Sequence, residues 1–120
     1  MRITIPISVG ELLDKISILQ IKSQHTDDPY VTKELRYLME IAKEYDVYDQ
    51  DSIDKLLEVN SKLWEIENTL RGFEKNQTFN DEFVYNARMV YITNDKRSEI
   101  KTNINRDTHS EFVEVKIYSV

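Results

Sequence analysis

The chain has 120 residues, of which 40% are hydrophobic and 32% charged, with two glycines, two prolines and no cysteine. This composition is typical of one folded, soluble domain, so we treat residues 1–120 as a single domain. A net charge of −6 and the lack of cysteine exclude a generic nucleic-acid surface, a disulfide framework and cysteine-based metal sites. Neither a signal peptide nor a run of about 18 apolar residues is visible. We therefore expect a cytoplasmic protein that binds no nucleic acid and no membrane.

Capping residues mark the first two expected helices. Ser8 and Glu11 have the spacing of a capping box, which predicts a helix over residues 9–24. In HTDDP an aspartate cap precedes Pro29, a residue that suits the first position of a helix. The second helix is therefore expected over residues 29–45, with one apolar face.

Two longer helices are expected in the second half of the chain. Asp51 is a cap candidate for a helix over residues 52–74, and the break KNQTFND precedes a fourth over residues 80–106. Apolar and polar residues alternate over residues 2–7 and again over 112–118, as in short strands. The predicted fold is mainly α: a bundle of about four helices with a two-stranded β-ribbon formed by the N- and C-terminal segments.

Polar residues interrupt the apolar face of the third helix. At ~100° per residue its apolar side chains span an arc of about 200°. Near the middle of that arc fall Asn60, Glu67, Arg71 and Glu74. Because burial of an unpaired charge costs several kcal/mol, these side chains either pair in a buried polar layer or line a cavity that admits water or a ligand.

The fourth helix carries a related stripe that changes from apolar to polar halfway along. It consists of Val84, Ala87, Tyr91, Asn94, Ser98, Lys101 and Asn105, with Arg88 and Asp95 beside it. Cations outnumber carboxylates among these interior candidates, which favours an anionic ligand. The candidate ligand-binding residues are Lys15, Lys22, Asn60, Arg71, Arg88, Tyr91, Asn94 and Lys101, and the candidate catalytic residues are Glu67 and Asp95.

Two functions of different classes agree with this pattern. The first is a non-catalytic interaction or assembly module whose polar layer determines which helices pair, either in a dimer of this chain or with another protein. The alternative is a small-molecule site, in the form of a binding site or an enzyme, that holds an anionic metabolite between helices. No motif for a cofactor and no His or Cys pair at metal-ligand spacing is present, so we expect neither cofactor nor metal.

Four segments resemble a family of small bacterial proteins that is described only as a domain of unknown function. They are GELLDKI (10–16), N-x-x-LW-x-IE (60–67), AR-x-VY-x-x-ND-x-R (87–97) and K-x-x-IN (101–105). The chain departs from the family pattern at Asn68, where an acidic residue is expected, and in its more β-like C-terminal tail. The resemblance implies no established activity, and it suggests a context in cell-surface polysaccharide metabolism.

Overall fold

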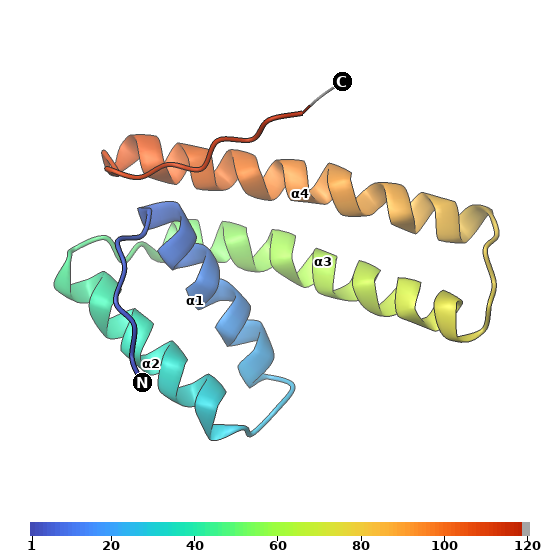
Figure 1. Cartoon of the computed structure of the whole chain (residues 1–120), viewed down its shortest axis with the longest axis horizontal. Helices are drawn as coiled ribbons and strands as arrows, with labels where there is room; N and C mark the ends of the chain where they lie inside the picture. Colours follow the sequence, from blue (N-terminus) through green and yellow to red (C-terminus); the bar gives the residue numbers. More distant parts are fainter. Residues whose placement is uncertain (119–120) are drawn as a thin grey trace.

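The chain folds into four helices in a computed structural model that describes residues 1–118 (Figure 1). They are α1 (Val9–Ser23), α2 (Pro29–Glu44), α3 (Gln50–Lys75) and α4 (Asp81–Asp107). The predicted mainly-α bundle is confirmed, and every predicted helix boundary lies within two residues of the observed one.

Each helix begins at a polar side chain that accepts a hydrogen bond from a free backbone N–H. Ser8 and Asp28 cap α1 and α2, with oxygen-to-nitrogen distances of 3.1 and 2.9 Å. Asn80 caps α4 in the same way at 3.0 Å. The cap of α3 is Asp49 rather than Asp51, because Asp49 has the extended backbone of a cap residue while Asp51 already lies in the first helical turn.

Helix α1 lies at the centre of the fold. It packs against α2 on one side and against α3 and α4 on the other, and within the described residues α2 makes no contact with α4. The core is formed where these helices meet. Its fully buried apolar side chains are Leu13, Ile16, Ala42, Ile53 and Leu56.

Gly10 allows the first turn of α1 to touch the backbone of α4. A Cβ atom at this position would lie 2.8 Å from the carbonyl oxygen of Lys101 and 2.9 Å from Oδ1 of Asn105. The Gly10 N–H instead donates a hydrogen bond of 2.7 Å to Oδ1 of Asn105. Any side chain at position 10 would push the two helices apart.

Beyond the end of α1, helices α3 and α4 continue as a two-helix hairpin (Figure 1). Ile66 is the buried residue in the second half of α3, and three phenylalanines, Phe73, Phe79 and Phe83, fill the turn in edge-to-face pairs. The radius of gyration is 16.2 Å. A compact domain of this length has about 14 Å, so the hairpin makes the molecule elongated.

The predicted β-ribbon is wrong, because residues 2–7 and 112–118 form no strand and do not pair with each other. The N-terminal segment runs beside α2, where the guanidinium of Arg2 lies 4.6 Å from the ring centre of Tyr37. The C-terminal segment runs back along α4 (Figure 1). The inner ends of the two segments adjoin, with the Val9 N–H donating to Oγ of Ser110 at 3.1 Å, and from there the segments diverge (Figure 1).

Candidate functional site

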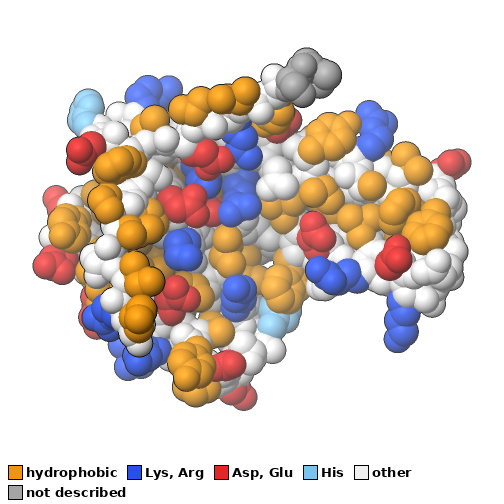
Figure 2. Space-filling model, in the orientation of Figure 1, with side chains coloured by type: hydrophobic (Ala, Val, Ile, Leu, Met, Phe, Trp, Pro, Cys, Tyr) orange, Lys and Arg blue, Asp and Glu red, His pale blue; other side chains and the backbone are white. Residues whose placement is uncertain are grey.

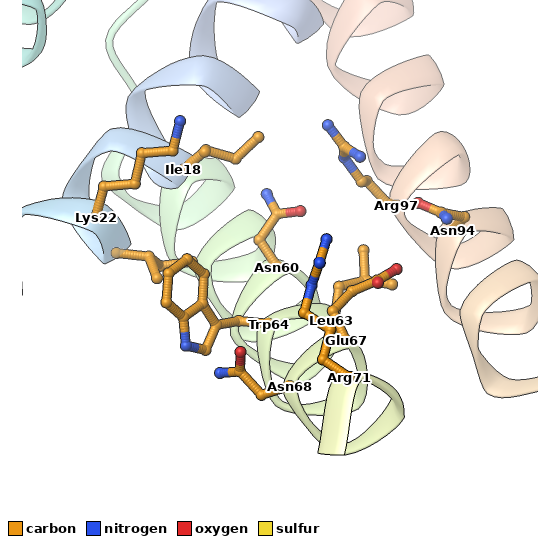
Figure 3. A pocket seen from close by; sticks show the side chains of 11 residues that line it. Ile18, Lys22, Asn60, Leu63, Trp64, Glu67, Asn68, Arg71, Asn94 and Arg97 are labelled. Carbon is orange, nitrogen blue, oxygen red and sulfur yellow. The ribbon is translucent and has the colours of Figure 1, made fainter. Parts of the chain in front are cut away.

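An open cleft lies where α1 ends against the continuing α3–α4 hairpin (Figure 3). Its volume is about 450 Å³, within the range of small-molecule sites. Helix α1 contributes Ile18, Ile21 and Lys22, α3 contributes Asn60, Leu63, Trp64, Glu67, Asn68 and Arg71, and α4 contributes Asn94 and Arg97. Five of the ten site residues predicted from the sequence therefore lie together: Lys22, Asn60, Glu67, Arg71 and Asn94.

One side of α3 faces α1 along the first half of the helix and solvent along the second half. Asn60 is buried because α1 covers it. Glu67, Arg71 and Glu74 lie on the same side of α3 further along, where α1 has ended, and they are exposed. Of the two predicted alternatives, the buried polar layer is therefore wrong for these three charged residues. Glu67 and Arg71 line the cleft, and Glu74 lies beyond it.

A buried polar network adjoins the cleft and connects three helices. Asp14 of α1 is fully buried. The Asn60 amide nitrogen donates hydrogen bonds to Oδ1 of Asp14 at 2.9 Å and to Oγ of Ser17 at 2.8 Å. Arg97 of α4 donates a second pair of hydrogen bonds to both carboxylate oxygens of Asp14, the one from Nε measuring 3.0 Å. This bidentate geometry compensates for the burial of the Asp14 charge.

Arg97 belongs to both the buried network and the cleft. Its side chain is 27% exposed, whereas that of its partner Asp14 is fully buried. The hydrogen bonds to Asp14 raise the pKa of the Arg97 guanidinium above its ordinary value. Asp14 thus fixes the position of a permanent positive charge at the edge of the cleft.

The charge of the cleft is positive although the whole chain is acidic. Three cations line it, Lys22, Arg71 and Arg97, against the single carboxylate of Glu67. Within residues 1–118, neither Lys22 nor Arg71 has a carboxylate oxygen within 4.0 Å, so both keep hydrogen-bonding capacity for a ligand.

Apolar side chains complete the lining of the cleft. Trp64, the one tryptophan of the chain, is partly exposed and lines the cleft beside Ile18, Ile21 and Leu63. Its indole stacks on the ring of His25 with centroids 4.6 Å apart and 17° between the planes. A flat aromatic surface next to cations suits an anion that carries an apolar part.

Lys101 lies in a neighbouring ionic cluster instead of the cleft. Its ammonium is 2.7 Å from Oε2 of Glu11 and 2.8 Å from Oε2 of Glu114. Burial lowers the pKa of Lys101, but hydrogen bonds to both carboxylates outweigh burial, so this pKa is raised. The hydrogen bond from Lys101 lowers the pKa of Glu114. This cluster joins α1, α4 and the C-terminal segment.

The other predicted site residues lie outside the cleft. Lys15, Arg88, Tyr91 and Asp95 are exposed, and none of them lines the cleft. Of the predicted stripe on α4, Lys101 and Asn105 are buried and Asn94 lines the cleft, whereas Val84 and Tyr91 are exposed. The catalytic candidate Asp95 instead accepts a 3.3 Å hydrogen bond from the hydroxyl of Tyr118.

Asp14, Arg97 and Trp64 were not among the predicted site residues. For Asp14 a signal was present, because Gly10, Asp14 and Ser17 form a small, polar stripe on a helix with neighbours on several sides. Arg97 lies seven residues before Ile104, a buried apolar residue, and therefore on the same face of α4.

Within residues 1–118, no group of three His, Cys, Asp or Glu side chains could hold a metal ion, and no helix is long and apolar enough to cross a membrane. The lining residues show no fit to a particular cofactor. The chemistry that they offer is hydrogen bonding and charge, together with one apolar wall.

Searches of curated proteins and of solved structures returned no match. The model of the Family of unknown function (DUF6165) matches residues 1–120, the whole length of the chain. The chain belongs to this family.

Proposed function

We propose that the cleft between α1, α3 and α4 binds a small organic anion, such as a carboxylate or phosphate with an apolar part. The observation that carries the proposal is the pair of cations, Lys22 and Arg71, that line the cleft without an ion-pair partner among residues 1–118. An exposed cation can remain solvated at little cost, but two of them in a cleft with the single lining carboxylate of Glu67 create a local positive field in an acidic protein.

Each part of the cleft has a distinct role in this proposal. Arg71 presents a planar fork of donors that matches a carboxylate or phosphate, and Lys22 adds a mobile positive charge from α1. Trp64 supplies the surface on which the apolar part of the ligand packs. Glu67 accepts a hydrogen bond from a hydroxyl or amine of the ligand, which discriminates against anions that lack such a group.

A catalytic role has less support than binding. Of the two candidate catalytic residues, Asp95 does not line the cleft and so is not placed to exchange a proton with a ligand there. Glu67 is exposed, which leaves its carboxylate solvated. The proposal therefore concerns recognition and contains no chemical step.

The fluorescence of Trp64 provides a direct test, since it is the single tryptophan and lines the cleft. Organic carboxylates and phosphates, including phenyl phosphate, would be titrated in parallel with their neutral analogues. We expect a saturable change in emission with a subset of the anions and none with the neutral analogues. Arg71→Met should weaken binding by ~10-fold or more, the equivalent of one charge-assisted hydrogen bond.

Arg88→Met is the matched control, because Arg88 is an exposed arginine outside the cleft. It should bind the same anions as the unmodified protein. Equal weakening by Arg71→Met and Arg88→Met would show that only general charge matters, and the proposed site would be wrong. Failure of every anion to perturb Trp64 would also contradict it.

A further inference from the structure

The two terminal segments carry the most exposed large aliphatic side chains of the described chain. Ile3 and Ile5 are 77% and 70% exposed, and Val115 and Ile117 are 72% and 86% exposed. Figure 2 shows the hydrophobic side chains as one row along the N-terminal segment at the left and another along the C-terminal segment at the top. Exposed apolar side chains in rows of this kind mark interaction surfaces.

A strand that covers a protein core turns its apolar side inward, and the C-terminal segment does the reverse. Its polar side contacts the helices, since Glu114 binds Lys101 and Tyr118 binds Asp95. Its apolar side, formed by every second residue from Val113 to Ile117, points into solvent. The contacts that hold the segment in place are therefore ionic and polar, and its apolar side has no partner among residues 1–118.

The N-terminal segment has the same character. Arg2 contacts Tyr37 of α2, while the isoleucines at alternate positions are exposed. Extended segments also carry backbone N–H and C=O groups that can form a strand ladder. The two segments meet at their inner ends, where the Val9 N–H donates to Oγ of Ser110 at 3.1 Å, and then diverge along α2 and along α4 (Figure 1), so they form no ladder with each other in this arrangement.

We propose that this chain forms a two-fold dimer in which the N-terminal segment of each copy pairs with the C-terminal segment of the other as an antiparallel β-ribbon. A two-fold axis produces two equivalent ribbons, so every terminal segment is paired. The inference is independent of the anion cleft, because no residue of either segment lines it.

Apolar spacing and charge select this pairing over a pairing of like segments. Three apolar residues at alternate positions, Ile3, Ile5 and Ile7, match three others, Val113, Val115 and Ile117. Residues 1–7 carry the cation Arg2 and no acid, whereas residues 111–118 carry two glutamates and one lysine. The side chains of the two kinds of segment therefore carry net charges of opposite sign, whereas two like segments carry net charges of the same sign.

Pro6 sets the hydrogen-bonding pattern of the ribbon. When Ile5 lies opposite Val115, Pro6 lies opposite Glu114. Pro6 has no N–H, so its pair must be a non-hydrogen-bonded one, and the Ile5–Val115 pair exchanges both backbone hydrogen bonds. The Cα atoms of such a pair are ~5.5 Å apart, a separation that a disulfide can span.

Single cysteines test this register cleanly, because the natural chain has none. Ile5→Cys and Val115→Cys would be purified separately, mixed and mildly oxidised. We expect a covalent dimer whose peptides join positions 5 and 115. It should form ~10-fold faster than the dimer from Ile5→Cys with Lys116→Cys, whose thiol lies on the other face of the strand, because pairing raises the local thiol concentration.

Two further measurements keep the proposal open to refutation. The double variant Ile5→Cys/Val115→Cys should give interchain disulfides, and a disulfide within a monomer would overturn the proposal in favour of a ribbon inside one chain. Sedimentation should show that Val115→Asp weakens the dimer while Val84→Asp, at an exposed valine of α4, leaves it intact. A monomeric natural protein at high micromolar concentration, or equal loss in both aspartate variants, would also overturn it.

Discussion

Loss of Arg97 should destabilise the fold more than loss of the Asp14 charge, because Asp14 is fully buried and Arg97 is partly exposed. Arg97→Met removes the cation and leaves Asp14, which is fully buried, with the Asn60 amide as its remaining side-chain donor. Loss of one partner of a buried ion pair costs about 3–5 kcal/mol because the other charge stays buried. We expect Arg97→Met to lower the unfolding free energy by that amount.

The reverse change, Asp14→Asn, should cost less. The guanidinium of Arg97 is 27% exposed and adjoins the open cleft, so it can turn toward water when its partner is lost. The asparagine keeps the shape of the side chain and can keep a hydrogen bond with Asn60. We expect a loss of about 1–3 kcal/mol, the cost typical of a hydrogen bond to a charged group.

Urea unfolding followed by circular dichroism would measure both losses. At roughly 4 °C per kcal/mol for a domain of this size, the melting temperature should fall by about 12–20 °C in Arg97→Met. The double variant should cost less than the sum of the single ones, because it leaves no unpaired charge. An equal or smaller loss in Arg97→Met than in Asp14→Asn would refute the reasoning from burial.

Three other predictions concern stability. Gly10→Ala should lower the unfolding free energy by about 1–3 kcal/mol, because the new Cβ would meet the backbone of α4. Gly72 has open space around it, so Gly72→Ala should raise the unfolding free energy by roughly 0.5–1 kcal/mol in the same urea melts. Glu67→Gln and Arg71→Met should each change the unfolding free energy by less than about 0.5 kcal/mol, since both residues are exposed; a larger loss would place them in a buried layer. The pKa of Glu114 is lowered from 4.5, so its ion pair with Lys101 stabilises the fold above pH 4.5 and this contribution is lost as the pH falls below that value. In urea melts across pH, the natural protein should be more stable than Glu114→Gln above pH 4.5, and the difference should disappear in more acidic solution.

Helix positions were predictable because their signals are local. Ser8, Pro29 and the polar break before α4 act on their nearest backbone neighbours, and the helices begin and end near these residues. The alternation at both termini predicted strands, and residues 1–118 contain none. Strand pairing was not predictable from that pattern, because pairing depends on where distant helices place each segment.

The buried face of α3 was mispredicted because one helical wheel was applied to its whole length. The 26 residues of α3 extend ~39 Å and the 15 residues of α1 only ~22 Å, so α1 cannot cover all of α3. Asn60 lies under α1 and is buried, and Glu67 lies past its end and is exposed. The contact between Asp14 and Arg97 joins residues 83 positions apart, so no local pattern could identify it.

The positions of the two arginines separate stability from binding in this fold. Asp14 neutralises most of the charge of Arg97, and a ligand that withdrew Arg97 would leave a buried carboxylate unpaired. An anion therefore gains little from Arg97 and must draw its affinity from Lys22 and Arg71, which have no such partner among residues 1–118. Arg97→Met should consequently impair folding far more than ligand affinity, and Arg71→Met should do the opposite. The early end of α1 creates this division, because it buries one half of a polar helix face and leaves the other half open to a ligand.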